Sequence, residues 1–125
     1  LAAELGKHDE AYKYFMHATR LDLDNYNRNT REGLHTTSIA AAWMNIVYGF
    51  GGMRSDGEIL SFMPSIPRGW TSFSFRVVYK GSILAISVNR EYSTFRVAKG
   101  NPVQIKVYGK EYTADEAGVN VPLNC

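Results

Sequence analysis

Residues 43–80 read WMNIVYGFGGMRSDGEILSFMPSIPRGWTSFSFRVVYK, and the spacing of the apolar residues changes within this stretch, near Gly57. Before Gly57 the apolar residues recur every three or four positions, which is typical of helices with one buried face. After it they alternate with polar residues, which indicates strands with one face in a core. We therefore expect an α+β fold, with a helical part at residues 1–57 and a sheet part at residues 58–125.

Two helical segments are expected before residue 21. Residues 1–5 have the character of a last helical turn, which Gly6 is expected to end as a C-cap. Asp9 is expected to be the N-cap of a second helix that runs to about Arg20. The residues of its buried face follow helical spacing and are Tyr12, Phe15, Met16 and Thr19.

A third helix is expected to begin near His35 or Thr36, after a polar stretch at residues 21–33, and to end at Gly49. It contains so few polar residues that we expect it to be buried on most sides, with Trp43 in the core.

Four alternating runs in the sheet part predict strands, at residues 71–80, 83–90, 94–98 and 103–108. The connections Lys80-Gly81-Ser82, Gly100-Asn101 and Gly109-Lys110 have the composition of hairpin turns. Strands that short turns join are antiparallel, so we expect an antiparallel sheet or a small sandwich. Trp70 follows a proline-bounded connector and is expected to pack this sheet against the helices.

Composition and charge exclude several classes of protein. The chain has 125 residues, of which 45% are hydrophobic and 21% charged, so it is not a disordered chain. Its formal net charge of +2 is too small to indicate a nucleic-acid partner, and the sequence contains no basic stripe of the kind that binds nucleic acids. No apolar run reaches the roughly 18 residues of a membrane span. The single cysteine, Cys125, cannot form an internal disulfide, so we expect a cytoplasmic protein.

The sequence begins at Leu1, without an initiator methionine and inside a helical pattern. We therefore expect the chain to be the C-terminal part of a longer one.

The start of the third helix carries the most informative residues. Gly33 lets the backbone turn, and His35, Thr36, Thr37 and Ser38 then fall in the first helical turn. A helix N-terminus presents unpaired N–H groups and the positive end of the helix dipole. The hydroxyls and the imidazole would complete an anion site suited to phosphate. The alternative is that the Thr and Ser side chains only cap the helix while His35 packs.

Residues 20–57, RLDLDNYNRNTREGLHTTSIAAAWMNIVYGFGGMRSDG, resemble the inverting disaccharide phosphorylases of glycoside hydrolase family 65, most closely those that act on maltose. The resemblance covers residues 1–90 and includes Leu60, Ser61, Phe62, Pro64, Pro67 and Trp70. It implies that residues 1–57 are the terminal helices of an (α/α)6 catalytic barrel. Residues 58–125 would be the antiparallel β domain that packs on this barrel.

The resemblance also implies a reaction. Phosphate would cleave an α-glucosyl disaccharide with inversion, giving β-glucose 1-phosphate and glucose; maltose is the expected substrate, and trehalose and kojibiose are the alternatives. His35 and Thr36 match the phosphate site. Thr37 and Ser38 are weaker candidates, because successive helical residues point about 100° apart. Nothing in this chain matches the general-acid glutamate of the family, so we assign no catalytic residue here and expect the chain alone to be inactive.

The expected partners follow from this assignment. They are a disaccharide and inorganic phosphate as co-substrate, with no cofactor, metal, nucleic acid or membrane. His8 and His17 have no partners at metal-ligand spacing. Helices taken from a barrel would expose apolar faces, so we also expect a homo-oligomer.

The remaining acidic residues near the motif have ordinary interpretations. Glu32 is expected to form a solvated ion pair with Arg28 or Arg31. Asp22 and Asp24 are expected to be turn and capping residues.

Two other classes of protein stay open. A carbohydrate-binding β module would expose a row of aromatic side chains, and Phe73, Phe75 and Tyr79 do share one parity. A sheet face buried against helices would give the same pattern. Residues 4–19 also resemble half of a tetratricopeptide repeat, but no copy recurs at the period of about 34 residues that such a helical interaction domain needs.

Overall fold

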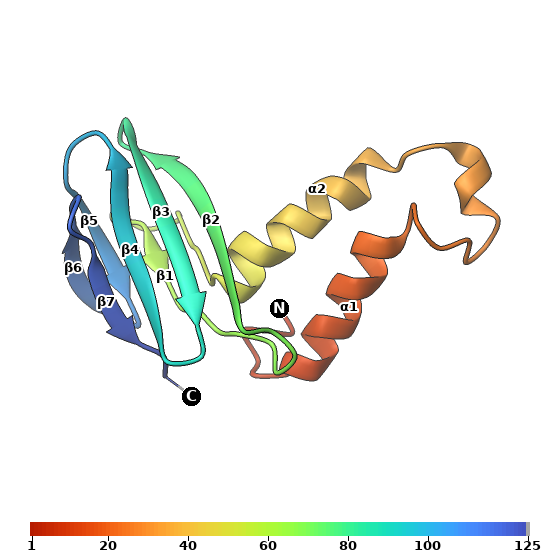
Figure 1. The fold of residues 1–125 in the computed structure, drawn as a ribbon, viewed down its shortest axis with the longest axis horizontal. Helices are drawn as coiled ribbons and strands as arrows, with labels where there is room; N and C mark the ends of the chain where they lie inside the picture. The colour runs from red at the N-terminus through yellow and green to blue at the C-terminus, as the bar shows by residue number, and fades with distance from the viewer. Residues whose placement is uncertain (125) are drawn as a thin grey trace.

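The structure is a computed structural model and describes residues 1–124, so Cys125 lies outside it. A two-layer β-sandwich forms one end of the molecule, and two helices extend from it side by side (Figure 1). These helices are α1 (His8–Arg20) and α2 (Thr36–Met44). The predicted α+β class is confirmed. Within the described residues, no helix is long and apolar enough to cross a membrane.

The first turn of the chain ends as predicted, but α1 does not begin as predicted. Gly6 has φ +70°. Its N–H donates to Ala3 O at 3.1 Å, and the N–H of Lys7 donates to Ala2 O at 2.9 Å, which together form a Schellman C-cap. The N-cap of α1 is Lys7, and Asp9 lies inside the first turn. The prediction of Asp9 as N-cap was wrong by two residues, although its charge still favours a helix N-terminus.

The third helical segment has two parts. After a short 3-10 helix, η1 (Asn29–Glu32), α2 begins at Thr36 as predicted. It continues directly into a π-helix, η2 (Asn45–Phe50), one residue beyond the predicted end at Gly49. In this wide turn the N–H of Gly51 donates to Ile46 O at 2.7 Å, five residues back.

The expected burial of α2 was wrong. No residue of α2 is buried, and Ile39 and Trp43 are 55% and 49% exposed. One neighbouring helix covers only one stripe of α2, and α1 is the helix that contacts it. Complete burial begins only in η2, at Val47 and Phe50, where the chain meets the sandwich.

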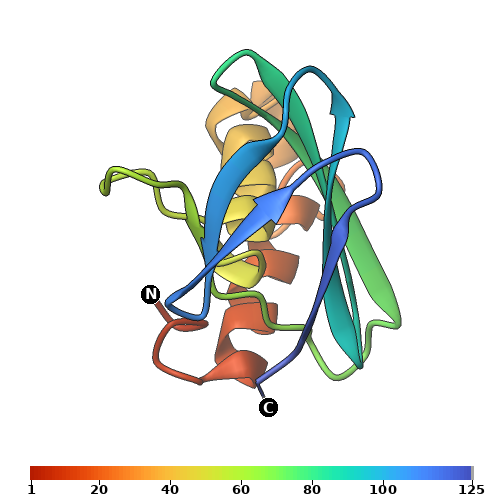
Figure 2. The ribbon, with the colours of Figure 1, turned by 90° about the vertical axis from the view of Figure 1, so that its left-hand side faces the viewer.

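Seven strands form the sandwich. They are β1 (Ser61–Phe62), β2 (Ser72–Tyr79), β3 (Ser82–Asn89), β4 (Tyr92–Lys99), β5 (Val103–Val107), β6 (Lys110–Ala114) and β7 (Val119–Pro122). One sheet has the order β1-β5-β6 and the other β2-β3-β4-β7, and Figure 2 shows the two sheets next to each other with the helices behind them. All pairs are antiparallel except β1–β5. The alternation of apolar and polar residues predicted β2 to β5 but not β1, β6 and β7.

Two of the three predicted hairpin turns are correct. Lys80-Gly81 and Tyr108-Gly109 both have positive φ at both central residues, as a type I′ turn requires. Gly100-Asn101 does not form a hairpin, because it joins β4 to β5 and these strands belong to different sheets. A segment with the composition of a hairpin turn therefore connects strands of two different sheets here.

The core lies between the sheets and continues to the helices through Trp70. Leu84, Phe95 and Ile105 are buried in the sandwich core, and each such side chain stabilises the fold by about 1.5–3 kcal/mol. The Trp70 ring lies 5.2 Å from Phe15 of α1 and 5.3 Å from Phe50 of η2. The predicted role of Trp70 at the junction is confirmed.

The aromatic residues of β2 do not form an exposed row. Phe75 is buried, and Phe73 and Tyr79 pack partly buried against the core. Phe73 lies 5.9 Å from Trp70 and 6.5 Å from Phe50. The face that a carbohydrate-binding module would expose is thus turned inward, and the buried-face interpretation holds.

Gly52 offers a test of the connection between η2 and the sandwich. It has φ +61°, and an added Cβ would lie 2.8 Å from the backbone nitrogen of Met63. We expect Gly52→Ala to lower the free energy of unfolding by about 3 kcal/mol or more in urea titrations. Gly81→Ala is the matched control: its φ is +77° but nothing lies within 4 Å, so only the strain of about 1–2 kcal/mol should be lost. Equal losses for the two variants would refute the steric argument.

Candidate functional site

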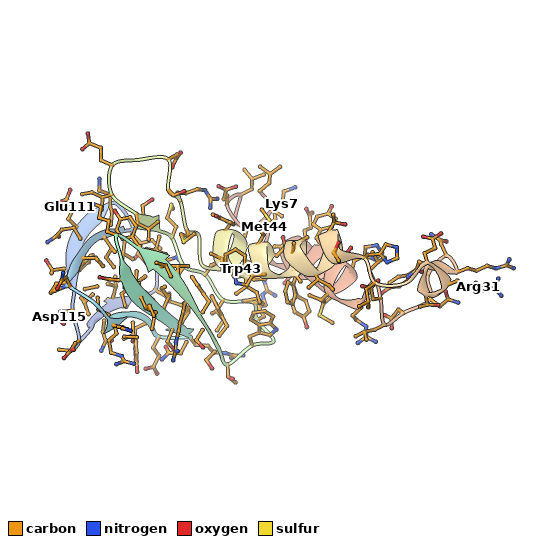
Figure 3. The ribbon with its side chains drawn as sticks, turned by 90° about the horizontal axis from the view of Figure 1, so that it is seen from above. Lys7, Arg31, Trp43, Met44, Glu111 and Asp115 are labelled. Atoms are coloured by element: carbon orange, nitrogen blue, oxygen red, sulfur yellow. The ribbon has the colours of Figure 1, made fainter. Side chains whose placement is uncertain are left out.

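The predicted anion-binding residues lie at the end of the helical pair that is distant from the sandwich. His35 is the N-cap residue of α2 and follows Gly33, whose φ of +87° makes the predicted turn. Arg31, in η1 just before this turn, marks this end of the molecule, whereas Glu111 and Asp115 lie at the opposite end (Figure 3). The site is thus built by the segment that joins α1 to α2.

Asp22 holds His35 by two contacts from the other side of this segment. The backbone N–H of His35 donates to Asp22 Oδ2 at 2.9 Å, and the ring Nδ1 lies 2.5 Å from Asp22 Oδ1. The Asp22 side chain is 14% exposed and that of His35 is 27% exposed. A carboxylate only accepts hydrogen bonds, so Nδ1 must carry the proton.

The two groups shift each other's protonation. The hydrogen bond that the ring donates to Asp22 raises the pKa of His35 above its usual value, with a smaller contribution from Glu32. The hydrogen bond from His35 lowers the pKa of Asp22. Both shifts favour the charged pair, a carboxylate beside an imidazolium.

Glu32 contacts the other ring nitrogen. Its Oε2 lies 3.6 Å from His35 Nε2, three residues along the chain, and the side chain is 74% exposed. The expected ion pair with Arg28 or Arg31 was wrong: among residues 1–124 neither arginine forms an ion pair. Glu32 is the last residue of η1, and the chain reverses at Gly33, whose φ is +87°, before it reaches His35.

The hydroxyl residues of the first turn separate into two groups. Thr36 and Thr37 are exposed, and we find no acceptor for their backbone N–H groups within the described residues. Ser38 is half-buried and lines a hollow of about 310 Å³ between α1 and α2, together with Asp22 and Thr19. The capping interpretation is not supported, because the helix has no side-chain capping hydrogen bond. Two free N–H donors therefore lie beside a charged imidazole.

No metal centre accompanies this arrangement in the part of the chain that is described: no three of its His, Cys, Asp and Glu residues could hold an ion together. His17 is exposed, with its ring 4.9 Å from that of Tyr26. His8 has a buried Nδ1 near the start of α1, far along the chain from His35. What the site offers to a ligand is hydrogen-bond donors, the imidazole of His35 and the N–H groups at the start of α2.

Asp22 is the residue whose role the sequence did not reveal. Its partner lies 13 residues away across an irregular segment, and no periodicity connects the two. Asp24 lies in the turn after α1, but its carboxylate accepts hydrogen bonds from two side chains, from Arg20 Nε at 2.7 Å and from Tyr26 Oη at 2.9 Å, and not from a capped backbone N–H. Two aspartates of one short motif thus have different roles, which only the fold separates.

Two models of protein families match the chain. The model described as "Glycosyl hydrolase family 65 central catalytic domain" matches residues 1–44, and the model described as "Glycosyl hydrolase family 65, C-terminal domain" matches residues 53–114. The first match contains Asp22, Glu32 and His35, and the second contains most of the sandwich.

Characterised relatives and a solved structure show the same similarity. The chain is 43% identical to maltose phosphorylase of Bacillus subtilis (strain 168), over 86% of this chain and 14% of that protein. It is 42% identical to alpha,alpha-trehalose phosphorylase of Geobacillus stearothermophilus, over 93% and 15%. It is 35% identical to kojibiose phosphorylase of Thermoanaerobacter brockii, over 92% and 15%. A structure titled "Putative kojibiose phosphorylase from human microbiome" superposes with a TM-score of 0.88 at 40% identity, over 97% of this chain and 16% of that one. The chain thus spans about one-seventh of the relatives that it matches.

The pair of Asp22 and His35 makes stability depend on pH. Folding raises the pKa of His35, so the stabilisation is complete below its unfolded value of about 6.5 and is lost as the pH rises through the raised pKa. Folding lowers the pKa of Asp22, so the stabilisation is lost again as the pH falls through that lowered value.

We expect urea titrations of the chain and of His35→Gln to differ most in free energy of unfolding between about pH 4 and 6.5, and less on either side. His17→Gln, at an exposed position without a carboxylate contact, is the matched control and should differ evenly across this range. A difference for His35→Gln that does not vary with pH would contradict the charged pair.

Proposed function

The chain belongs to glycoside hydrolase family 65, and we propose that it is the C-terminal part of an inverting disaccharide phosphorylase. Models of this family match residues 1–44 and 53–114, and its relatives of 35–43% identity are named phosphorylases. The chemical part of the proposal rests on one observation. Asp22 holds the imidazole of His35 beside the free backbone N–H groups at the start of α2.

The proposed reaction needs an anion site more than a second carboxylate. Phosphate oxygen attacks the anomeric carbon of the α-glucosyl unit, while the bond from this carbon to the glycosidic oxygen breaks and a general acid protonates that oxygen. A hydrolase that inverts configuration needs a carboxylate base to activate water. Phosphate is already a nucleophile, so a phosphate pocket takes the place of that base. The products are β-glucose 1-phosphate and glucose.

Within this chain we assign phosphate binding to His35 and Thr36. The Nε2–H of the imidazolium would donate to a phosphate oxygen, and the exposed Thr36 would add its hydroxyl and its free backbone N–H. Thr37 offers a backbone N–H but lies a further 100° around the helix. Ser38 is the weakest candidate, because it lines the hollow between α1 and α2. We propose no catalytic residue in the chain and place the general-acid glutamate elsewhere in the enzyme.

The exposed faces of the helices fit the same proposal. Trp43 and Ile39 are apolar and about half exposed, as helices of a barrel would be when their neighbours are absent. We propose that residues 1–57 end the (α/α)6 barrel, that residues 58–125 form its β domain, and that the enzyme is a cytoplasmic homo-oligomer that needs no cofactor or metal.

We propose maltose as the disaccharide, on the resemblance of residues 20–57. Identities of 43% and 42% to a maltose and a trehalose phosphorylase are too close to decide between these sugars, and kojibiose is the third candidate. Discrimination between disaccharides depends on the pocket of the leaving glucose, to which we assign no residue of this chain.

The phosphate site is tested in the complete enzyme that carries this segment. We expect His35→Ala to raise the KM for phosphate at least tenfold and the KM for disaccharide less than twofold, because it removes one charge-assisted hydrogen bond to phosphate. His17→Ala is the matched control and should change neither constant. An unchanged KM for phosphate in His35→Ala would overturn the assignment.

The division of labour within the enzyme is tested with the chain alone. Because the chain has no assigned general acid, we expect no β-glucose 1-phosphate from maltose, trehalose or kojibiose with phosphate, measured by a coupled enzymatic assay. The complete enzyme, assayed beside it with the same three sugars, identifies the substrate. Measurable phosphorolysis by the chain alone would show that the acid lies within it.

A further inference from the structure

The strongest feature outside the assigned phosphate contacts is Asp22, which accepts two hydrogen bonds from a single residue. Oδ2 takes the backbone N–H of His35 at 2.9 Å, and Oδ1 lies 2.5 Å from the ring Nδ1. A bond to the backbone alone would hold the start of α2. A bond to the ring as well fixes the rotation of the imidazole, which otherwise turns freely about its two side-chain torsions.

The position of Asp22 is itself fixed by the segment around it. Asn29 Nδ2 donates to Leu21 O at 2.5 Å and to Asp24 O at 3.2 Å, which closes the segment on itself. Asp22 is therefore presented to His35 by a constrained backbone, and its carboxylate is largely shielded from water.

The two acidic neighbours of His35 differ in how firmly they are held. Asp22 meets Nδ1 at hydrogen-bond distance from a shielded position, whereas Glu32 lies 3.6 Å from Nε2 and is mostly exposed. A shielded, doubly bonded carboxylate stays in place, but an exposed one can move aside for a ligand at little cost. These are the two titratable groups that face the ring, one from the segment after α1 and one from η1; α2 itself carries none.

We propose that Asp22 is a positioning residue for phosphorolysis: it holds the imidazole of His35 by Nδ1, so that Nε2–H is presented to inorganic phosphate. This rests on the proposed function and adds to it a residue that does not touch phosphate. Glu32 occupies the same nitrogen when phosphate is absent and moves aside when phosphate binds. The raised pKa of His35 agrees with this role, because only the protonated ring offers a donor at Nε2.

The test compares Asp22→Asn with Asp24→Asn in the complete enzyme. The two changes are chemically identical and two residues apart, but only Asp22 contacts His35. We expect Asp22→Asn to raise the KM for phosphate about tenfold, with the KM for disaccharide within twofold, through loss of one charge-assisted hydrogen bond. Asp22→Glu, which keeps the charge, should recover part of this loss, and Asp24→Asn should show none of it.

The pH profile separates positioning from a merely structural role. Without the Asp22 carboxylate the pKa of His35 falls toward its ordinary value, so the pH above which phosphate binding weakens should move lower in Asp22→Asn. Phosphate titrates too, but equally for every variant. The outcomes are distinct. If His35→Ala weakens phosphate binding and Asp22→Asn changes neither KM nor profile, the positioning role is wrong and the proposed function stands. If neither variant weakens phosphate binding, the proposed function itself fails.

A measurement on the unaltered chain keeps the proposal falsifiable if Asp22→Asn does not fold. Ring ¹⁵N chemical shifts of His35, followed by NMR across a pH titration, report which nitrogen keeps its proton when the ring becomes neutral. We expect Nδ1 to keep it, with a midpoint above about 6.5. A neutral ring that carries its proton on Nε2, or a midpoint at or below that value, would overturn the proposal.

Discussion

The arrangement of this molecule depends on one aromatic junction between its helices and its sandwich. Trp70 lies against Phe15 of α1, Phe50 of η2 and Phe73 of β2. Phe15 is the buried residue of α1, so this contact joins to the sandwich a helix that otherwise packs against α2. Aromatic pairs contribute about 0.5–1.5 kcal/mol each beyond their buried area. The helices that carry the proposed anion site are therefore joined to the sandwich by a hydrophobic contact at their opposite end.

Local patterns in the sequence predicted those elements whose geometry is set locally. The alternation in β2 to β5, the two type I′ turns and the start of α2 at Thr36 depend on neighbours within a few residues. The burial of α2 could not be predicted in this way. The apolar side chains of α2 favour packing against other elements. Their exposure depends on how many such elements the chain contains. The crossing at Gly100-Asn101 was misjudged because turn composition does not say which sheet the next strand joins.

The candidate site divides in the same manner. His35 and Thr36 were found because a helix N-terminus with an imidazole and hydroxyls is a local signature. Asp22 was not, because its bond to His35 closes an irregular segment that follows no period. The interpretation of Glu32 failed for a related reason: Arg28 and Arg31 are near it in the sequence, but the backbone turn at Gly33 leaves it 3.6 Å from the ring of His35 instead. Charge content alone does not decide which ions meet; backbone conformation does.

The π-helix η2 acts as a rotational spacer between the sandwich and α2. It begins at the end of α2 and ends at Phe50, which belongs to the aromatic junction, and a helix turns by about 100° for each residue. The extra residue in this wide turn therefore sets the position of His35 around the helix axis, relative to the sandwich. A single-residue deletion in this segment would preserve the composition of the proposed anion site and still rotate it by about 100° around the helix axis. The length of η2 thus helps to set the orientation of the proposed phosphate site, although none of its residues belongs to that site.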